Sequence, residues 1–294
     1  LLNIRLFLVK RMNMRLGVGR VTWKVKLRMI RLFLFSIALL ISSTILAQTD
    51  IPPGTWRTHN AYNRLLSLTS TDVNLVAAVN SAIFLYNPAT GESEEITRLT
   101  GLSDSEISSI GFNQNTDRIL IAYGNGNIDF IDNSKIINFP ELLNSEIPGS
   151  KQVNHIYDSD EFSYLSSDFG VMIIDHIKNE VKDSYFELGK DGNSIKVFSS
   201  TIRDDTVYLA TEEGIIRGHM NTNLKDYNNW LRYNTNDGMP TSQVKIILST
   251  PTGLLAAFDN AGIYEFAGNK WLITNLLEQE SFISASQHLA KSIL

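Results

Sequence analysis

One sequence pattern recurs along the chain at a nearly constant interval, and this repeat limits the possible folds more than any other feature. Equivalent points in the pattern are Ala82, Gly126, Gly170, Gly214 and Gly262, so the intervals are 44, 44, 44 and 48 residues. About 44 residues make one four-stranded sheet with its turns, which is one blade of a propeller. A β-sandwich does not produce such equal intervals, and a β-solenoid repeats faster. The repeat therefore predicts an all-β fold, a β-propeller.

Each of these points follows a short apolar segment and opens the next strand. The preceding segments read LVAAV, ILIAY, FSYLS, VYLAT and LLAAF. Nearly continuous apolar runs are typical of strands covered on both faces, so we expect them to be the inner strands, with alanines where the sheets converge. The four glycines predict tight hairpin corners with positive φ. We predict about five complete four-stranded blades, at residues 65–98, 104–139, 151–187, 195–233 and 243–275.

The two ends of the repeat region predict how the ring closes. Residues 54–62, GTWRTHNAY, read as a short aromatic strand that completes the last blade and hides the edges of the ring. Residues 281–294 resemble the start of a sixth unit. β-Propellers typically have about four to eight blades, and we expect a ring of this size to need six to eight. We therefore expect the propeller, residues 49–294, to be incomplete and truncated at its C-terminal side.

The N-terminal segment is basic and then apolar. Residues 1–48 contain nine Lys and Arg and no Asp or Glu, and the apolar run Leu32–Leu46 has 15 residues. That run is short for a membrane span of about 20 residues but suits a signal peptide. We predict a signal peptide at residues 29–48 with Ala47 near the cleavage point, and no stable membrane span afterwards. Residues 1–28 read as upstream translation or an extension, or alternatively as a basic amphipathic anchor.

Composition narrows the classes of partner. The residues after the predicted signal peptide carry 17 basic and 31 acidic side chains, a net charge of −14. An acidic body argues against nucleic acid as a partner, since phosphate binding needs a basic surface. The chain has no cysteine, which excludes disulfides, thiolate metal sites and a lipid-modified N-terminal cysteine.

The sequence contains no recognisable catalytic, cofactor-binding or metal-binding motif. No two histidines have the spacing of a helical zinc site, no GxSxG is present, and GNGN at 124–127 is best explained as a hairpin. We expect three of the histidines to lie at strand ends. Those three are His59, His155 and His176, and the other two are His219 and His288. We predict a non-enzymatic protein without a cofactor.

Two further groups of residues could bind ligands. Asp158, Asp160 and Glu161 form the one dense acidic turn; calcium is conceivable there, but a solvated hairpin turn is the better explanation. Scattered aromatic residues could form a sugar-binding platform, but packing between blades, mainly near outer strands, explains them better. These are Trp56, Tyr62, Tyr86, Tyr157, Tyr185, Trp230, Tyr233 and Trp271.

The paired phrases TGLSDSEI and DGMPTSQV, each followed by apolar strands, resemble the repeats of two-component-regulator propellers. A closer resemblance, over roughly residues 54–275, is to the PorZ family, surface components of the type IX secretion system of Bacteroidota. It rests on GTWRTHNAYN, FLYNPATGESEEITRLTGLSDSEISSIGFN, ILIAYGNGNIDFID, NHIYDSDEFSYLSSDFGVMIIDHIKNEVKDSYFELG and VYLATEEGIIRG. The resemblance implies a protein with two propellers and a C-terminal β-sandwich sorting domain. It also implies that proteins of this family take part in delivering anionic lipopolysaccharide to the machinery that anchors cargo. It supplies no catalytic or ligand residue for this chain.

Three functions follow as hypotheses. The first is an exported, non-enzymatic platform at the cell surface or outer membrane, or alternatively in the periplasm, that binds secretion-system proteins, anionic lipopolysaccharide or both. The second is the extracytoplasmic ligand-sensing propeller of a hybrid two-component regulator. The third is an exported propeller enzyme that acts on polysaccharide.

Overall fold

A computed structural model describes residues 64–133 and 135–276, which belong to one compact unit. Several sequence predictions fall outside the described residues and stay predictions. They concern the extension 1–28, the signal peptide 29–48, the strand at 54–62 and the sixth unit 281–294, together with His59, His288, Trp56 and Tyr62. Within the described part of the chain, no helix is both long enough and apolar enough to cross a lipid bilayer.

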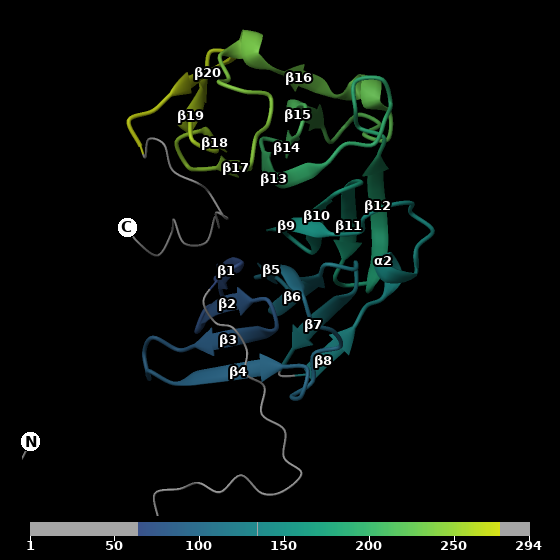
Figure 1. Cartoon of the computed structure of the whole chain (residues 1–294), viewed down its shortest axis with the longest axis vertical. Coiled ribbons are helices and arrows are strands. Elements are labelled where there is room, and N and C mark those ends of the chain that lie inside the picture. Colours follow the sequence, from purple (N-terminus) through teal and green to yellow (C-terminus); the bar gives the residue numbers. More distant parts are fainter. Residues whose placement is uncertain (1–63, 134, 277–294) are drawn as a thin grey trace, which may run out of the picture. The chain divides into compact units, whose positions relative to one another are not determined.

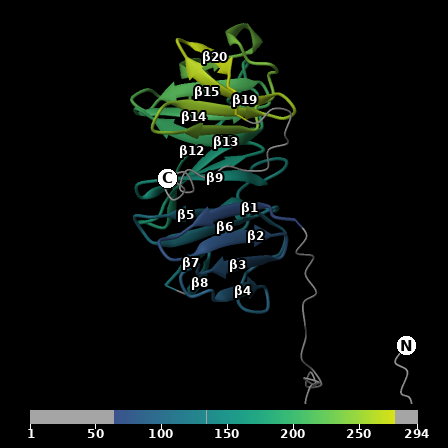
Figure 2. The ribbon, with the colours of Figure 1, turned by 90° about the vertical axis from the view of Figure 1, so that its left-hand side faces the viewer.

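The described residues form five four-stranded antiparallel sheets, which Figures 1 and 2 show in chain order from blue to yellow. Within each sheet the strands follow chain order, so each sheet is a simple meander. Blade 1 consists of β1 (Ser67–Ser70), β2 (Leu75–Val79), β3 (Ala82–Tyr86) and β4 (Ser93–Thr97). Blade 2 consists of β5 (Ile107–Asn113), β6 (Arg118–Tyr123), β7 (Ile128–Asp132) and β8 (Lys135–Asn138).

The remaining three sheets repeat this arrangement, so the predicted propeller fold with five complete blades is confirmed. Blade 3 consists of β9 (Val153–Ser159), β10 (Phe162–Ser167), β11 (Gly170–Asp175) and β12 (Glu180–Phe186). Blade 4 consists of β13 (Val197–Arg203), β14 (Thr206–Thr211), β15 (Gly214–His219) and β16 (Leu231–Tyr233). Blade 5 consists of β17 (Ile246–Ser249), β18 (Leu254–Phe258), β19 (Gly262–Ala267) and β20 (Lys270–Ile273). Within residues 64–133 and 135–276, the helical turns are α2 (Glu141–Asn144), η2 (Tyr227–Asn229) and η3 (Thr235–Asp237).

The glycine corners of the repeat adopt the positive φ that the sequence predicts. Gly170 is the clearest example, with φ of 135° at the first residue of β11. A Cβ atom at this position would lie 2.1 Å from the carbonyl oxygen of Tyr185 in the neighbouring strand β12. The corner therefore needs glycine for two reasons, its backbone conformation and the close approach of the next strand.

Successive blades are joined because the second strand of a blade buries both of its faces. In β6, Ile121 belongs to the apolar cluster shared with blade 1, whereas its neighbour Leu120 belongs to the cluster shared with blade 3. Strand β14 does the same, with Leu209 facing blade 3 and Tyr208 facing blade 5. Side chains alternate across a strand, so a continuous apolar run supplies two cores at once. Four such cores form the 1/2, 2/3, 3/4 and 4/5 interfaces between adjacent blades.

The expectation that these apolar runs are the innermost strands is wrong. The strands that contact their equivalents in adjacent blades are the first ones, β1, β5, β9, β13 and β17. They are rich in small polar residues, and their hydroxyls accept backbone N–H groups from the adjacent blade. Examples are Ile247 N to Ser199 Oγ at 2.8 Å and Ser249 N to Thr201 Oγ1 at 3.2 Å. Small side chains allow the close approach, and the hydroxyls satisfy backbone donors that no neighbouring strand pairs.

Candidate functional site

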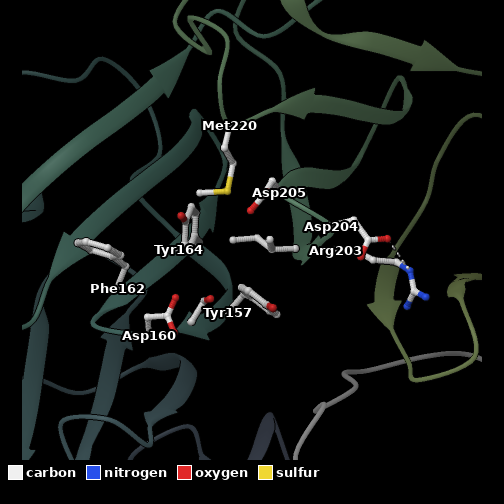
Figure 3. Close-up of a pocket in the computed structure, with 10 residues that line it drawn as sticks. Tyr157, Asp160, Phe162, Tyr164, Arg203, Asp204, Asp205 and Met220 are labelled. Atoms are coloured by element: carbon white, nitrogen blue, oxygen red, sulfur yellow. Dashed lines mark ion pairs between the residues drawn. The ribbon is translucent and has the colours of Figure 1, made fainter.

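A cavity of about 400 Å³ lies at one edge of the 3/4 interface. Its walls come from the β9–β10 hairpin of blade 3, the β13–β14 hairpin of blade 4 and the residue that follows β15. The residues that determine its chemistry are Tyr157, Asp160, Phe162, Tyr164, Asp205 and Met220. We call this cavity the 3/4 pocket, and Figure 3 shows it with its lining side chains.

The acidic residues of the 3/4 pocket are placed by tight turns. Arg203 pairs with Thr206, so Asp204 and Asp205 form a two-residue hairpin loop, and their φ angles are 48° and 54°. Positive φ at both central residues is the geometry of a type I′ turn, which Asp and Asn tolerate better than most residues. Asp160, in the equivalent turn of blade 3, has φ of 50°. Equivalent turns of adjacent blades thus bring carboxylates from two blades to one cavity.

The carboxylates of the 3/4 pocket differ in their direction and their partners. In Figure 3, Asp160 and Asp205 face the space beside Tyr164 from opposite sides, whereas Arg203 and Asp204 extend away from it. Arg203 Nη1 donates to the carbonyl oxygen of Thr250 at 2.6 Å, and its Nε lies 3.5 Å from a carboxylate oxygen of Asp204. Among the described residues, the carboxylates of Asp160 and Asp205 have neither a hydrogen bond nor an ion pair.

The other walls of the pocket are aromatic. The rings of Tyr157 and Tyr164 meet edge to face, with centroids 6.2 Å apart. Burial raises the pKa of both phenols, and for Tyr157 the backbone N–H of Ile202 and the hydroxyl of Thr201 partly oppose this. Both phenols are therefore neutral at pH 7. Lys182 places its ammonium 3.2 Å from the ring centroid of Phe162, so this wall already holds a cation.

The 3/4 pocket offers hydrogen-bond acceptors and aromatic faces but no nucleophile activated by a neighbouring base. Tyr164 is only 3% exposed, and no residue described by the structure is a hydrogen-bond partner of its hydroxyl. Across the described ranges, no group of three His, Asp or Glu side chains is arranged to hold a metal ion.

A second polar cluster lies at the 2/3 interface, and it corrects the prediction made for Asp158. Asp160 and Glu161 are exposed in the turn, as expected, but Asp158 lies in β9 and points into the interface. Its carboxylate accepts the hydroxyl of Ser163 and the backbone N–H of Phe112, and burial raises its pKa to about 6. The close approach is possible because Gly111 has no side chain, since a Cβ there would lie 2.5 Å from Asp158 Oδ2.

His176 completes this cluster from the residue after β11. Its Nε2 lies 2.5 Å from Ser163 Oγ, and its side chain is buried against Phe130 with ring centroids 5.4 Å apart. Burial first, and then the positive charge of Arg118, lower the pKa of His176 to about 4, so it is neutral at pH 7.

The cluster is not a hydrolase triad, although it contains Ser, His and Asp. In a triad the histidine lies between the serine and the carboxylate, but here Ser163 lies between Asp158 and His176. Ser163 is 0% exposed, so no substrate reaches it. The prediction that histidines lie at strand ends holds for His176, which directly follows β11. It is wrong for His155, which lies inside β9.

The aromatic residues also divide. Tyr185, Tyr233 and Trp271 lie in outer strands and are buried, as the packing interpretation expects. Tyr157 instead lies in the first strand β9 and lines the 3/4 pocket. The sequence interpretation missed Tyr157 as a pocket residue because it treated the aromatics as one group.

Five four-stranded antiparallel meanders, packed through second strands that are buried on both faces, define a β-propeller protein. Residues 75–231 match the model of a protein family described as "TSS9, PorZ, N-terminal beta-propeller domain". This match covers more than half of the chain, which therefore belongs to the PorZ N-terminal β-propeller family. A search of curated proteins found no match.

Solved structures of similar fold come from two kinds of protein. One is PorZ, described as an essential bacterial surface component of the type IX secretion system of Porphyromonas gingivalis, with 22% identity, a TM-score of 0.63 and coverage of 74% of this chain and 29% of that one. Another is the extracellular domain of BT3049 from B. thetaiotaomicron, described as a hybrid two-component system, with 16% identity, a TM-score of 0.57 and coverage of 73% and 30%. The chain spans less than a third of either solved chain, and at these identities the likeness concerns the fold.

Proposed function

We propose that the chain is a non-enzymatic binding platform of the type IX secretion apparatus, exported and acting at the outer surface of the cell. The observation that carries this proposal is the family match over residues 75–231. A rigid set of blades that presents loops from several sheets is suited to recognition. The 3/4 pocket, which contains acceptors and aromatic faces but no activated nucleophile, supports a binding role over an enzymatic one.

Proteins and anionic lipopolysaccharide are both candidate partners, and charge favours proteins for this part of the molecule. Residues 49–294 carry a net charge of −14, and the pocket presents unpaired carboxylates. A negatively charged surface repels an anionic glycan unless basic residues are gathered locally. We therefore propose that this propeller contacts a protein of the secretion apparatus.

Deletion of the gene tests the platform role. In the source bacterium, we expect deletion to remove secretion cargo from the cell surface and to leave it inside the envelope, and a restored gene to reverse both effects. Cell fractionation and surface labelling of a cargo protein measure this. Unchanged surface attachment of cargo in the deletion strain would contradict the proposal.

The second candidate is a ligand-sensing propeller, favoured by the similar fold of the BT3049 extracellular domain. Under this alternative, deletion leaves cargo attachment intact and abolishes a transcriptional response to a ligand such as a glycan. RNA sequencing of the same deletion strain, grown with and without glycans, separates the two roles.

A further inference from the structure

We infer that the 3/4 pocket binds a cationic side chain, lysine or arginine, of a partner protein. The inference rests on the proposed function of a binding platform and names the chemistry of its partner. It follows from three features of the pocket: its surplus of hydrogen-bond acceptors, its aromatic walls and its unpaired charge.

The acceptors come from both blades. Asp160 and Asp205 direct carboxylates toward the cavity from opposite sides, and among the described residues neither carboxylate has a partner. Tyr164 is only 3% exposed, and its hydroxyl likewise has no hydrogen-bond partner in the described ranges. A guanidinium or an ammonium supplies several N–H donors and no acceptor, so it complements a cavity with this composition.

The walls are suited to the same ligand. The faces of aromatic rings attract cations, and the chain demonstrates this at Phe162, where the ammonium of Lys182 lies 3.2 Å from the ring centroid. Tyr157 and Tyr164 line the rest of the cavity and are neutral at pH 7. The alkyl part of a lysine or arginine side chain can lie against Met220, which is 43% exposed at the rim.

Other ligand classes fit less well. The one basic residue of the lining, Arg203, turns its guanidinium away to Thr250, so an anionic group finds no partner there. A neutral sugar could stack on the tyrosines, but it would leave two negative charges unneutralised. A cation removes this unfavourable charge and gains aromatic contact, so it is the ligand the cavity favours.

The methyl group of Met220 provides a direct reporter of binding. The chain contains six methionines, so a ¹³C-methyl-methionine spectrum of the full chain has few signals, and a Met220→Leu variant assigns the relevant one. The probes are Nα-acetyl-arginine methylamide and Nα-acetyl-lysine methylamide. We expect saturable shifts of the Met220 methyl signal, weakened at high salt.

Matched variants separate the pocket from the general acidity of the surface. Asp205→Asn keeps a residue that tolerates the turn but removes a charge that faces the cavity, and we expect affinity to fall about tenfold. Asp160→Asn should have a similar effect. Asp204→Asn removes a charge from the same turn that extends away from the cavity, and we expect affinity to change less than about twofold. The signals of the buried Met172 and Met239 check that each variant is folded.

Several outcomes would overturn the inference. The first is the absence of a Met220 shift, and the second is an equal loss of affinity in the Asp204 and Asp205 variants. The third is equal or tighter binding of an uncharged probe (Nα-acetyl-citrulline methylamide or methyl glucoside) or of the anion glucuronate. The titrations measure ligand binding to the isolated protein, whereas the gene deletion measures cargo attachment in the cell. The inference and the proposed function can therefore fail separately.

Discussion

The 2/3 and 4/5 interfaces occupy equivalent positions in the repeat but are built from different chemistry. Aromatic packing is prominent at the 4/5 interface, where Tyr233 of blade 4 meets Phe266 of blade 5 with ring centroids 5.2 Å apart, and Phe266 meets Trp271 of its own blade at 5.0 Å. The buried Nε1 of Trp271 has no hydrogen-bond partner among the described residues. The 2/3 interface combines an apolar core with the buried side chains of Ser163 and His176 and the half-buried side chain of Asp158.

Further polar contacts cross the 2/3 interface at the ends of its strands. Arg118 of blade 2 binds Asp132 in its own blade and donates to the carbonyl oxygen of His176 at 2.8 Å and to Asn179 Oδ1 at 2.6 Å in blade 3. Asn113 Nδ2 donates to the carbonyl oxygen of Asp160 at 2.8 Å. These contacts have directional requirements that apolar packing lacks.

The difference indicates that the repeat specifies where blades meet but not how they are held together. Apolar contact supplies most of the stability at both interfaces. Buried polar groups add geometric definition, and they make stability sensitive to protonation and to single atoms. Stability should therefore depend mainly on side-chain volume at the 4/5 interface. At the 2/3 interface it should also depend on the charge and polarity of the side chains.

The largest expected effect is at the 4/5 interface. Trp271 is 1% exposed, so Trp271→Ala should lower the free energy of unfolding by about 3–5 kcal/mol through lost burial and a cavity. Its neighbour in β20, Leu272, is 54% exposed, and Leu272→Ala should change stability by less than about 0.5 kcal/mol. Urea unfolding followed by far-UV circular dichroism measures both. Equal effects of the two substitutions would show that β20 does not pack as described.

The pH dependence of stability should distinguish the 2/3 interface. His176 has a lowered pKa of about 4, so its contribution is lost as pH falls from about 6.5 toward 4. Asp158 has a raised pKa of about 6, so its contribution is lost as pH rises from about 4 to 6. The two trends oppose each other, so in the parent protein the contributions of these two groups should nearly cancel between pH 4.5 and 6.

Asp158→Asn removes one of the two trends. The contribution of His176 to the stability of this variant should fall by about 2 kcal/mol as pH decreases from 6.5 to 4.5, because the opposing contribution of Asp158 is removed. In His176→Phe the trend should reverse, with stability falling as pH rises through the same window. Urea unfolding at four pH values measures the profiles, and parallel profiles for the parent and both variants would contradict the buried placement of these groups.

A single methyl group should disturb the 2/3 interface as well. Gly111→Ala places a Cβ 2.5 Å from Asp158 Oδ2 and Ile156 Cγ2 across the interface, which should cost about 1–3 kcal/mol. Gly124→Ala is the matched control in the same blade, because its Cβ would meet an atom only at 3.6 Å. Thermal unfolding of the two variants should differ by several degrees, and similar melting temperatures would count against close contact at Gly111.

The smallest expected effect concerns the feature that the two interfaces share. Ser199→Ala removes the acceptor for the backbone N–H of Ile247 in the next blade, which should cost about 1 kcal/mol. Amide exchange of Ile247 should accelerate more than that of Leu248, its neighbour in β17. Unchanged exchange at Ile247 would show that the hydroxyl does not hold this amide.

Much of the fold could be predicted because each blade repeats the same local pattern. The positions of Gly126, Gly170, Gly214 and Gly262 reveal the hairpin corners, and the apolar runs reveal the strands that are buried on both faces. The role of the first strands was missed because serine is common in loops. The serines of a strand such as VFSSTIR have a structural role only because the equivalent strand of the next blade is close enough for their hydroxyls to accept its backbone N–H groups.

The candidate site was less predictable, for reasons that differ between residues. Asp160 and Asp205 lie in equivalent turns of consecutive repeats, so an alignment of the repeats contains the signal that would have placed them together. The position of Asp158 against blade 2 depends on Gly111 in that blade. No local pattern around Asp158 reports that contact, and an acidic residue beside a turn is ordinarily solvated.

The central claim is that consecutive sheets adjoin through their first two strands, and the absence of cysteine from the chain permits a direct test. Ser166 Oγ of blade 3 lies 3.0 Å from Ser200 Oγ of blade 4. A variant that combines Ser166→Cys with Ser200→Cys should form one intramolecular disulfide on mild oxidation, visible by mass spectrometry of the peptides, whereas each single variant keeps its thiol. Free thiols or disulfide-linked dimers in the folded double variant would contradict the arrangement of blades described here.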